Sequence, residues 1–331
     1  MRSTLVLLAL VLPACGSRIN AMPDAADGNA NDAIVPIDAS RDDTVAVDAA
    51  ADSTTSPDVV ATDSGAGAWP DPSNTGPSRD ATATMGGTAF TSVGTETNPI
   101  VHEAESYTGP IDLMAPAAWH VFRDCRVASG DYFGIHIHEG VSHVIIERCD
   151  VGGQFTAVLI DADATDVVVQ RNNLHDCENG ITTNGTNVQI LDNYVHNDAI
   201  GRSWGSDPHW DGIEVYGGGT VLIRHNNLAL DGHTDTSLVN IAPWGGPVVV
   251  DGVRIEGNLL GGGGYQYTFD ARQSETADAV RNVVVTGNHH RSLAGYGLAN
   301  ITAGVGYTWT ANVWDCNGAP ADVGDWPAPC P

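Results

Sequence analysis

The stretches VIIERCDV at 144–151, VVVQRNNL at 167–174 and VQILDNYV at 188–195 decide the fold class, because they repeat one pattern. Apolar residues alternate with other residues over the first half of each stretch, and Cys or Asn stands at the sixth position. The same pattern, with small departures, returns at 120–127, 221–228, 253–260, 283–290 and 307–314. Short alternating runs are typical of β-strands, and a unit repeated at a near-constant interval is typical of a solenoid.

The sixth position of the repeat marks one coil of this solenoid. It is occupied by Cys125, Cys149, Asn172, Asn193, Asn226, Asn258, Asn288 and Asn312. The shortest steps between these residues are 21 to 24 residues long, which is the length of one coil of a right-handed parallel β-helix. We therefore predict an all-β fold, a single-stranded right-handed parallel β-helix of at least eight coils over 69–331. The asparagines should stack at an inside turn, each amide bonded to the next.

A second strand is predicted in every coil, and its alternation assigns the two faces of the sheet. The residues expected to point inward are Ile135, Val158, Ile181, Ile213, Val239, Phe269 and Ala299. The residues expected in the next outward column are His136, Leu159, Thr182, Glu214, Asn240, Asp270 and Asn300. Two residues further on, a second outward column contains His138, Asp161, Asn184, Tyr216, Ala242, Arg272 and Thr302. A slip in register would change the columns of the last coils.

The N-terminal residues indicate export. Residues 1–15 have the form of a signal peptide, with an apolar run too short to span a bilayer. The Leu12–Cys15 ending resembles the lipobox of bacterial lipoproteins, which implies a lipid-modified Cys15 and a protein exported and anchored at the bacterial outer membrane or cell surface. The alternative is an ordinary secretory signal with an incidental cysteine. Residues 16–68, rich in Ala, Asp, Ser and Thr, are predicted to be a disordered linker.

Charge and cysteine content limit the partners and the chemistry. The formal net charge is −27, so nucleic acid is a poor partner, and we expect a monomer that meets the membrane only through its lipid anchor. All 14 basic residues are arginine, which excludes a lysine base. In an exported chain Cys316 and Cys330 are the expected disulfide pair. Cys125 and Cys149 are placed one coil apart and could also pair, leaving Cys177 free.

Insertions in three consecutive coils predict a groove. They fall at 197–210, before one second strand, and at 242–252 and 271–282, after the next two. Long loops beside one strip of sheet form walls, and functional residues concentrate in such grooves. The predicted floor consists of Glu214, Tyr216, Asn240, Asp270 and Arg272.

The candidate site residues follow from this groove. Glu214 and Asp270, about 9.6 Å apart if two strands separate them, suit either an inverting glycosidase pair or, with Asp211, the ligands of a calcium ion. Arg272, His209 and Tyr216 are candidates to move a proton. The candidate substrate-binding residues are Asn240, Trp210, Trp244, His136 and Tyr267, since aromatic rings stack on sugars. The structural alternatives are a solvated acidic face, a turn at Asp211, packing of the aromatic rings under the loops, and an exposed or metal-chelating pair at His136 and His138.

From about Trp69 to Trp314 the chain resembles the pectate-lyase-like superfamily of right-handed parallel β-helix proteins. The segments WPDPSNTGP at 69–77 and WTANVWD at 309–315 carry this likeness together with the repeats. Polygalacturonase-type hydrolases of this superfamily have Asn-Thr-Asp, Asp-Asp, Gly-His-Gly and Arg-Ile-Lys motifs, and the solenoid has none of them. Its lyases commonly use an Arg or Lys base with calcium held by Asp and Glu.

The resemblance and the groove together predict a surface-tethered carbohydrate-active protein. The leading hypothesis is a calcium-assisted polysaccharide lyase that cleaves an acidic glycan by β-elimination. The alternatives are an inverting glycoside hydrolase using Glu214 and Asp270, and a glycan-binding or adhesive surface protein without catalysis.

Overall fold

The computed structural model describes residues 67–197, 209–230, 237–244, 246–291 and 295–325. The chain divides into a unit at Met1–Asp63 and a unit at Ser64–Pro331, and all described residues belong to the second. The predicted signal peptide with Cys15, nearly all of the predicted linker, and Cys330 lie outside the described residues. Cys316 is disulfide-bonded, and its pairing with Cys330 stays a prediction.

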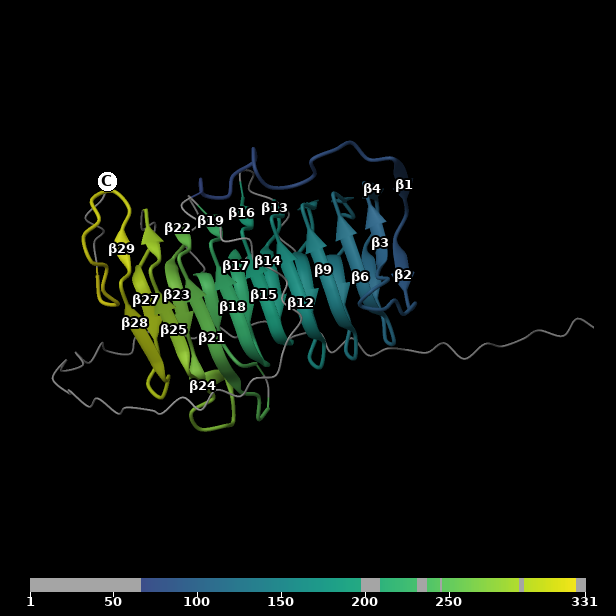
Figure 1. Cartoon of the computed structure of the whole chain (residues 1–331). Coiled ribbons are helices and arrows are strands. Elements are labelled where there is room, and N and C mark those ends of the chain that lie inside the picture. Colours follow the sequence, from purple (N-terminus) through teal and green to yellow (C-terminus); the bar gives the residue numbers. More distant parts are fainter. Residues whose placement is uncertain (1–66, 198–208, 231–236, 245, 292–294, 326–331) are drawn as a thin grey trace, which may run out of the picture. The chain divides into compact units, whose positions relative to one another are not determined.

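Three parallel sheets form the solenoid (Figure 1). Sheet A contains, in spatial order, β1 (Ala83–Met85), β4 (Glu105–Tyr107), β7 (Arg126–Val127), β10 (Asp150–Gly152), β13 (Asn173–His175), β16 (Tyr194–His196), β19 (Asn227–Leu230), β22 (Leu259–Gly262), β26 (His289–His290) and β29 (Val313–Trp314). Sheet B contains β2 (Thr88–Phe90), β5 (Ile111–Leu113), β8 (Phe133–Ile137), β11 (Thr156–Ile160), β14 (Asn179–Thr183), β17 (Asp211–Val215), β20 (Ser237–Ile241), β23 (Tyr265–Phe269) and β27 (Gly297–Ile301).

Sheet C contains the strands with which most of the sequence repeats begin. Its strands are β3 (Ile100–Glu103), β6 (Ala118–Arg123), β9 (Ser142–Glu147), β12 (Thr165–Gln170), β15 (Thr186–Leu191), β18 (Gly219–Arg224), β21 (Val250–Glu256), β25 (Val283–Thr286) and β28 (Tyr307–Thr310), and β24 (Val280–Arg281) pairs with β21. The chain runs from sheet C to A to B in each coil. One 3₁₀ helix, Ala271–Gln273, follows β23. The predicted parallel β-helix is confirmed.

The repeat contains two strands where we predicted one. A residue with positive φ stands directly before each stacked Cys or Asn, for example Arg148 at 49°, Asp192 at 55° and His225 at 53°. The left-handed conformation turns the chain sharply, so the residues after the stacked position join sheet A instead of extending the sheet C strand. Alternation alone did not reveal this corner, because the apolar residues continue on both sides of it.

The predicted asparagine ladder is confirmed at the corner between sheets C and A. The Nδ2 group of Asn172 donates to Oδ1 of Asn193 at 2.9 Å, and the same bond links each following pair as far as Asn312. Each ladder amide also donates to a backbone carbonyl one coil earlier, such as Asn226 to Ile190 at 2.9 Å. These buried amides therefore hold consecutive coils in register.

The pairing of Cys125 with Cys149, which the sequence left open, does not form. Both residues continue the ladder as free, buried thiols, and Cys177 is a third. The Cys149 thiol lies 3.6 Å from the carbonyl oxygen of Phe122, toward the backbone of the preceding coil. Burial raises the pKa of Cys177 to about 12, so this thiol is a packing group rather than a nucleophile.

The segment 67–82 lies across the corners of several coils (Figure 1). The Trp69 ring stacks on His225 with centroids 5.1 Å apart, and the Gly76 amide donates to the Arg171 carbonyl at 3.0 Å. Ser78 bonds the buried carboxylate of Asp124 at 2.9 Å. The segment thus ties together coils that are distant in the sequence.

The register of sheet B confirms most of the predicted columns and corrects one coil. Glu214 is aligned with Thr182 and Asn240, as predicted, but the next residue in that column is Thr268. Tyr267 takes the inward position that we assigned to Phe269, and Asp270 moves to the column of Tyr216. Both Tyr267 and Phe269 are fully buried. A shift of two residues preserves alternation, so the hydrophobic pattern could not detect it.

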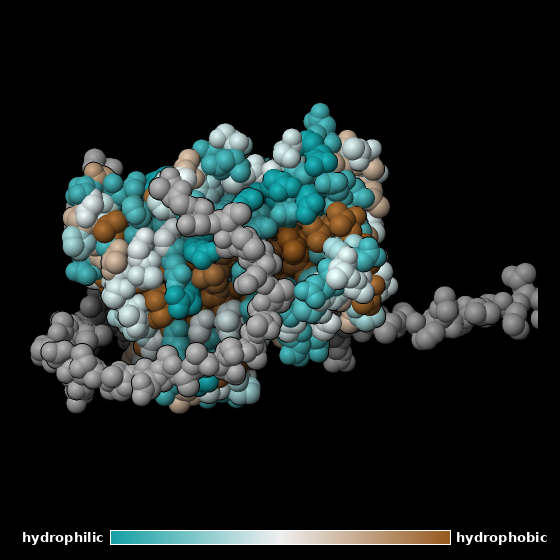
Figure 2. Space-filling model, viewed as in Figure 1, coloured by the Kyte–Doolittle hydropathy of each residue, from teal (hydrophilic) through white to brown (hydrophobic). Residues whose placement is uncertain are grey.

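The outward face of sheet C contains an apolar column. The backbone register aligns Val101, Val121, Ile145 and Val168 in neighbouring strands. Figure 2 shows hydrophobic groups gathered in a band between hydrophilic surfaces on the viewed face.

Among the described residues, no helix has the length and apolar character needed to cross a membrane.

Candidate acidic site on sheet B

A buried pair of carboxyl groups lies on the outer face of sheet B. Asp211 begins β17, Glu214 lies three residues later, and they are only 6% and 3% exposed. The parallel coils stack their side chains so closely that Thr182 and Asn240 cover Glu214 from the two neighbouring strands. The sequence thus places two acids where water has little access.

Hydroxyl groups saturate the carboxyl of Glu214. The Thr182 hydroxyl donates to Glu214 Oε2 at 2.6 Å, and the Tyr216 hydroxyl donates to Glu214 Oε1. The backbone amide of Ser237 donates to Asp211 Oδ1 at 2.8 Å. Three adjacent coils therefore contribute to one polar cluster, which we call the acid site and define as Asp211, Glu214, Tyr216, Thr182 and Asn240.

The proximity of the two carboxyls perturbs their ionisation. Burial raises the pKa of Glu214 well above its ordinary value, and the charge of Asp211 raises it further. Burial also raises the pKa of Asp211, against the hydrogen bonds that it accepts. The pKa of the Tyr216 hydroxyl is raised by burial and then by Glu214, so this phenol stays protonated at neutral pH.

Asn240 supplies a buried oxygen that has no hydrogen-bond partner. Its amide group bonds Asp211, and its Oδ1 atom is buried and unsatisfied. An unpaired buried oxygen beside two carboxyls raises the energy of the cluster, and a cation would satisfy all three groups. Calcium prefers carboxylate and amide oxygens, so Asp211, Glu214 and Asn240 fit as part of a calcium ligand set.

Two of the predicted site residues lie beside this cluster, and a third does not offer an exposed ring. His209 is exposed and interacts electrostatically with Asp211. Trp244 is half-buried, and its amide donates to the Tyr216 carbonyl at 3.3 Å. Trp210 is only 3% exposed, so its predicted role as a stacking surface for sugars is wrong.

Asp270 and Arg272 form a separate pair. Asp270 caps the 3₁₀ helix and accepts two bonds from the Arg272 guanidinium, at 2.9 and 3.1 Å. Burial opposes ionisation of Asp270, but these bonds lower its pKa. The corrected register places its backbone about 12 Å from that of Glu214. Asp270 is therefore further from Glu214 than predicted and is paired with Arg272, while calcium binding itself stays a prediction.

Two further predicted residues lie in other surroundings. Tyr267 is fully buried inside the solenoid and cannot contact a glycan, so that prediction is wrong. His136 lies on the outer face of sheet B, as predicted, but it is 8% exposed and bonds Asp161 at 2.9 Å. It belongs to a different polar cluster, three strands from Glu214.

Sequence reasoning missed Glu178. This residue precedes β14, is 4% exposed, and accepts a bond from the His209 amide at 3.0 Å. It stands in the turn before the alternation of the strand begins, so the pattern gave its side chain no direction. Glu178 stands one residue before Asn179, and Asn179 is aligned with Asp211 in the next coil. This alignment is the feature of the sequence that could have identified Glu178.

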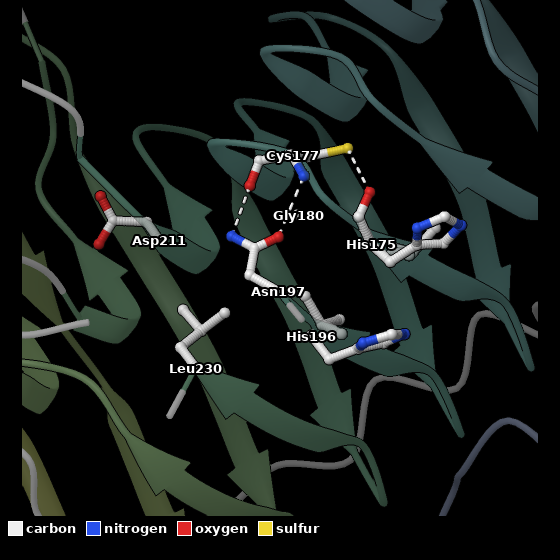
Figure 3. A pocket seen from close by; sticks show the side chains of 9 residues that line it. His175, Cys177, Gly180, His196, Asn197, Asp211 and Leu230 are labelled. Carbon is white, nitrogen blue, oxygen red and sulfur yellow. Dashed lines mark hydrogen bonds between the residues drawn. The ribbon is translucent and has the colours of Figure 1, made fainter. Parts of the chain in front are cut away.

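A small cavity lies behind the acid site, at the corner between sheets A and B (Figure 3). Asn197 closes it through reciprocal bonds with the backbone of Cys177, at 3.1 and 2.8 Å. Asp211 contributes to its wall, but Figure 3 shows the Asp211 carboxyl pointing away from Cys177 and Asn197. Among the acid-site residues, only Asp211 lines this cavity.

Comparison with known families agrees with this architecture. A family model described as the right handed beta helix region matches residues 104–232. No curated protein matches the chain. The match fits a carbohydrate-active or surface protein only in broad terms and indicates no specific activity. The three parallel sheets and the asparagine ladder give the described residues a parallel β-helix fold, and this match over part of the chain agrees with its right-handed form.

Proposed function

We propose that this protein is a surface-tethered, calcium-assisted polysaccharide lyase of the pectate-lyase-like type, anchored through Cys15 and acting on an acidic glycan. The observation that carries the proposal is the buried carboxyl pair Asp211 and Glu214, next to the unsatisfied Oδ1 atom of Asn240. Closely spaced oxygens with raised carboxyl pKa values favour a shared cation.

The spacing of the acids favours a lyase over a hydrolase. The two carboxyls of glycosidases are about 5–5.5 Å apart in retaining enzymes and about 6.5–9.5 Å apart in inverting ones. Asp211 and Glu214 are hydrogen-bonded to each other, which is too close for either arrangement. The backbones of Glu214 and Asp270 are about 12 Å apart, and the Asp270 carboxylate is already paired with Arg272, which argues against its use as an acid or base with Glu214.

Calcium held by Asp211, Glu214 and Asn240 would neutralise the uronate carboxylate and make the adjacent carbon acidic. His209 accepts the proton from that carbon. The electron pair of the broken C–H bond forms a double bond as the β C–O bond breaks. Because the Tyr216 phenol stays protonated, it donates its proton to the departing oxygen and recovers one from water.

Arg272 is suited to substrate binding rather than to proton transfer. Its side chain is 71% exposed and lies beyond the Tyr216 column on the same sheet. A guanidinium offers two parallel donors to a carboxylate and does not deprotonate at neutral pH. In a chain of net charge −27 it would hold a uronate one or two sugar rings from the acid site.

Calcium removal is expected to abolish activity on a uronate polymer. Without the cation, nothing at the acid site neutralises the substrate carboxylate, so the rise in ultraviolet absorbance from the unsaturated product should stop in EDTA. It should return on adding calcium in excess. Activity that survives EDTA overturns the calcium role, and binding without product on a broad glycan panel favours the adhesive alternative.

The affinity for calcium is expected to rise with pH. Burial raises the pKa of both Asp211 and Glu214, so calcium must displace protons until the pH exceeds those raised values. Each displaced proton should strengthen binding by about tenfold per pH unit. Calorimetric titrations from weakly acidic to alkaline pH measure this slope, and a pH-independent affinity contradicts binding at these carboxyls.

A further inference from the structure

A second polar cluster lies on the same face of sheet B, toward the N-terminal end of the solenoid. It consists of Asp112 in β5, His136 in β8, His138 directly after β8 and Asp161 directly after β11. The strand register aligns Asp112 with His136. The strand of His136 lies about 14 Å from the strand of Glu214, which corresponds to three spacings between parallel strands. The acid site uses none of these residues.

We propose that Asp112, His136 and His138 bind a divalent transition-metal ion of the zinc class. One ligand atom from each residue lies within 4.8 Å of those of the other two. Asp112 Oδ1 is 3.2 Å from His138 Nε2 and 3.8 Å from His136 Nδ1. Ligands about 2.0–2.1 Å from a tetrahedral zinc ion are roughly 3.3 Å from one another. The two separations that involve Asp112 therefore lie within about half an ångström of this ligand spacing.

Asp161 is placed to orient one of these ligands. Its Oδ2 atom is 2.9 Å from His136 Nε2, the ring nitrogen that does not face Asp112. A carboxylate that accepts the Nε2 proton leaves Nδ1 unprotonated and directs its lone pair toward the ion. This is the arrangement in which a metal-binding histidine donates its second nitrogen to a carboxylate.

The surroundings of the cluster favour an accessible site with an open position. His136 is 10% exposed at its side chain and is held against Phe133, with ring centroids 4.5 Å apart. His138 and Asp112 are each 31% exposed, so an ion can enter from solvent. Three protein ligands leave a fourth position for water or a substrate oxygen. Imidazole nitrogen prefers zinc-class ions over calcium, so the two sites select different cations.

Titration of the full chain with Zn²⁺ and Co²⁺ tests the site independently of the lyase proposal. We expect one ion per chain at this cluster and the intense visible absorption of four-coordinate Co²⁺. His138→Gln should weaken binding by at least about tenfold, and Asp161→Asn by about 10–100-fold, mainly through His136, which lies closer to the Asp161 carboxylate than His138 does. His143→Gln is the matched control, because His143 has the same 31% side-chain exposure and a carboxylate neighbour, Asp166.

The outcomes separate the proposals. Loss of Zn²⁺ and Co²⁺ binding in His138→Gln, with calcium binding retained, supports a second site of different chemistry. Equal binding by wild type, His138→Gln and His143→Gln overturns it, and so does the absence of binding to folded wild type at micromolar ion. Circular dichroism of each variant verifies the fold, and because the His138 side chain is 31% exposed, its substitution is better tolerated than one at the more buried His136.

Discussion

Asn226→Ala is expected to lower the free energy of unfolding by about 3–5 kcal/mol, since each buried group left without its partner costs about 1–3 kcal/mol. Asn226 is fully buried in the middle of the ladder. Its Nδ2 group donates to Ile190 and Asn258, at 2.9 and 3.0 Å. Its Oδ1 atom accepts from the backbone and side-chain nitrogens of Asn193, at 2.9 and 3.0 Å. Alanine removes these four bonds from a dry interior and leaves the Asn193 backbone amide without this acceptor, while Asn193 Nδ2 keeps its bond to Val169 and Asn258 Oδ1 keeps its bond from the backbone amide of residue 226.

Urea unfolding followed by circular dichroism measures the loss in free energy of unfolding. Two further variants provide values for comparison. Asn98→Ala removes an exposed asparagine and should change the free energy by less than about 0.5 kcal/mol. Asn312→Ala, at the end of the ladder, should cost less than Asn226→Ala because a coil lies on one side of it only. A loss below about 1 kcal/mol at Asn226 contradicts the view that the ladder holds the coils in register.

The ladder and the solenoid could be predicted because they are repetitive. Each coil independently shows the same alternation and the same Asn position, so a single ambiguous coil does not change the conclusion. The acid site could be predicted in part for the same reason: Glu214, Asn240 and Tyr216 follow from the columns of well-aligned coils.

The errors arose where repetition gives no information. A two-residue shift keeps the inward face apolar at Tyr267 and Phe269, so the displacement of Asp270 left no trace in the pattern. The corner residues Arg148 and Asp192 differ in type, and their shared positive φ is a property of the backbone. Trp210 lies at the end of an inserted loop, and its burial depends on tertiary packing that local spacing does not encode.

Glu214→Gln is expected to reduce turnover of the uronate polymer by about 10²–10³-fold, the usual cost of losing one well-placed electrostatic group. The amide keeps the size of the carboxyl but replaces one of its two acceptor oxygens with a donor NH2 group and carries no charge for the cation. The hydroxyl of either Tyr216 or Thr182, which donate to different oxygens of Glu214, would therefore lose its acceptor. Turnover is measured by product absorbance, and calcium affinity by calorimetry, where a parallel loss is expected. Glu139→Gln, at an exposed residue after β8, should leave both unchanged.

Without calcium, the stability of the same variant relative to the wild type should rise with pH, which distinguishes a functional from a structural role. Burial raises the folded-state pKa of Glu214 above its unfolded value, so the folded state binds the extra proton. The contribution of Glu214 to the free energy of unfolding is then fully present below its unfolded-state pKa. It is lost as the pH rises through its raised folded-state pKa. Glutamine removes that term, so the difference in free energy of unfolding between the two proteins should grow with pH. A Gln variant that is less stable than the wild type at every pH would show that Glu214 is retained for folding. Higher stability combined with lost turnover is typical of a carboxyl that is retained for binding or catalysis at a cost in stability.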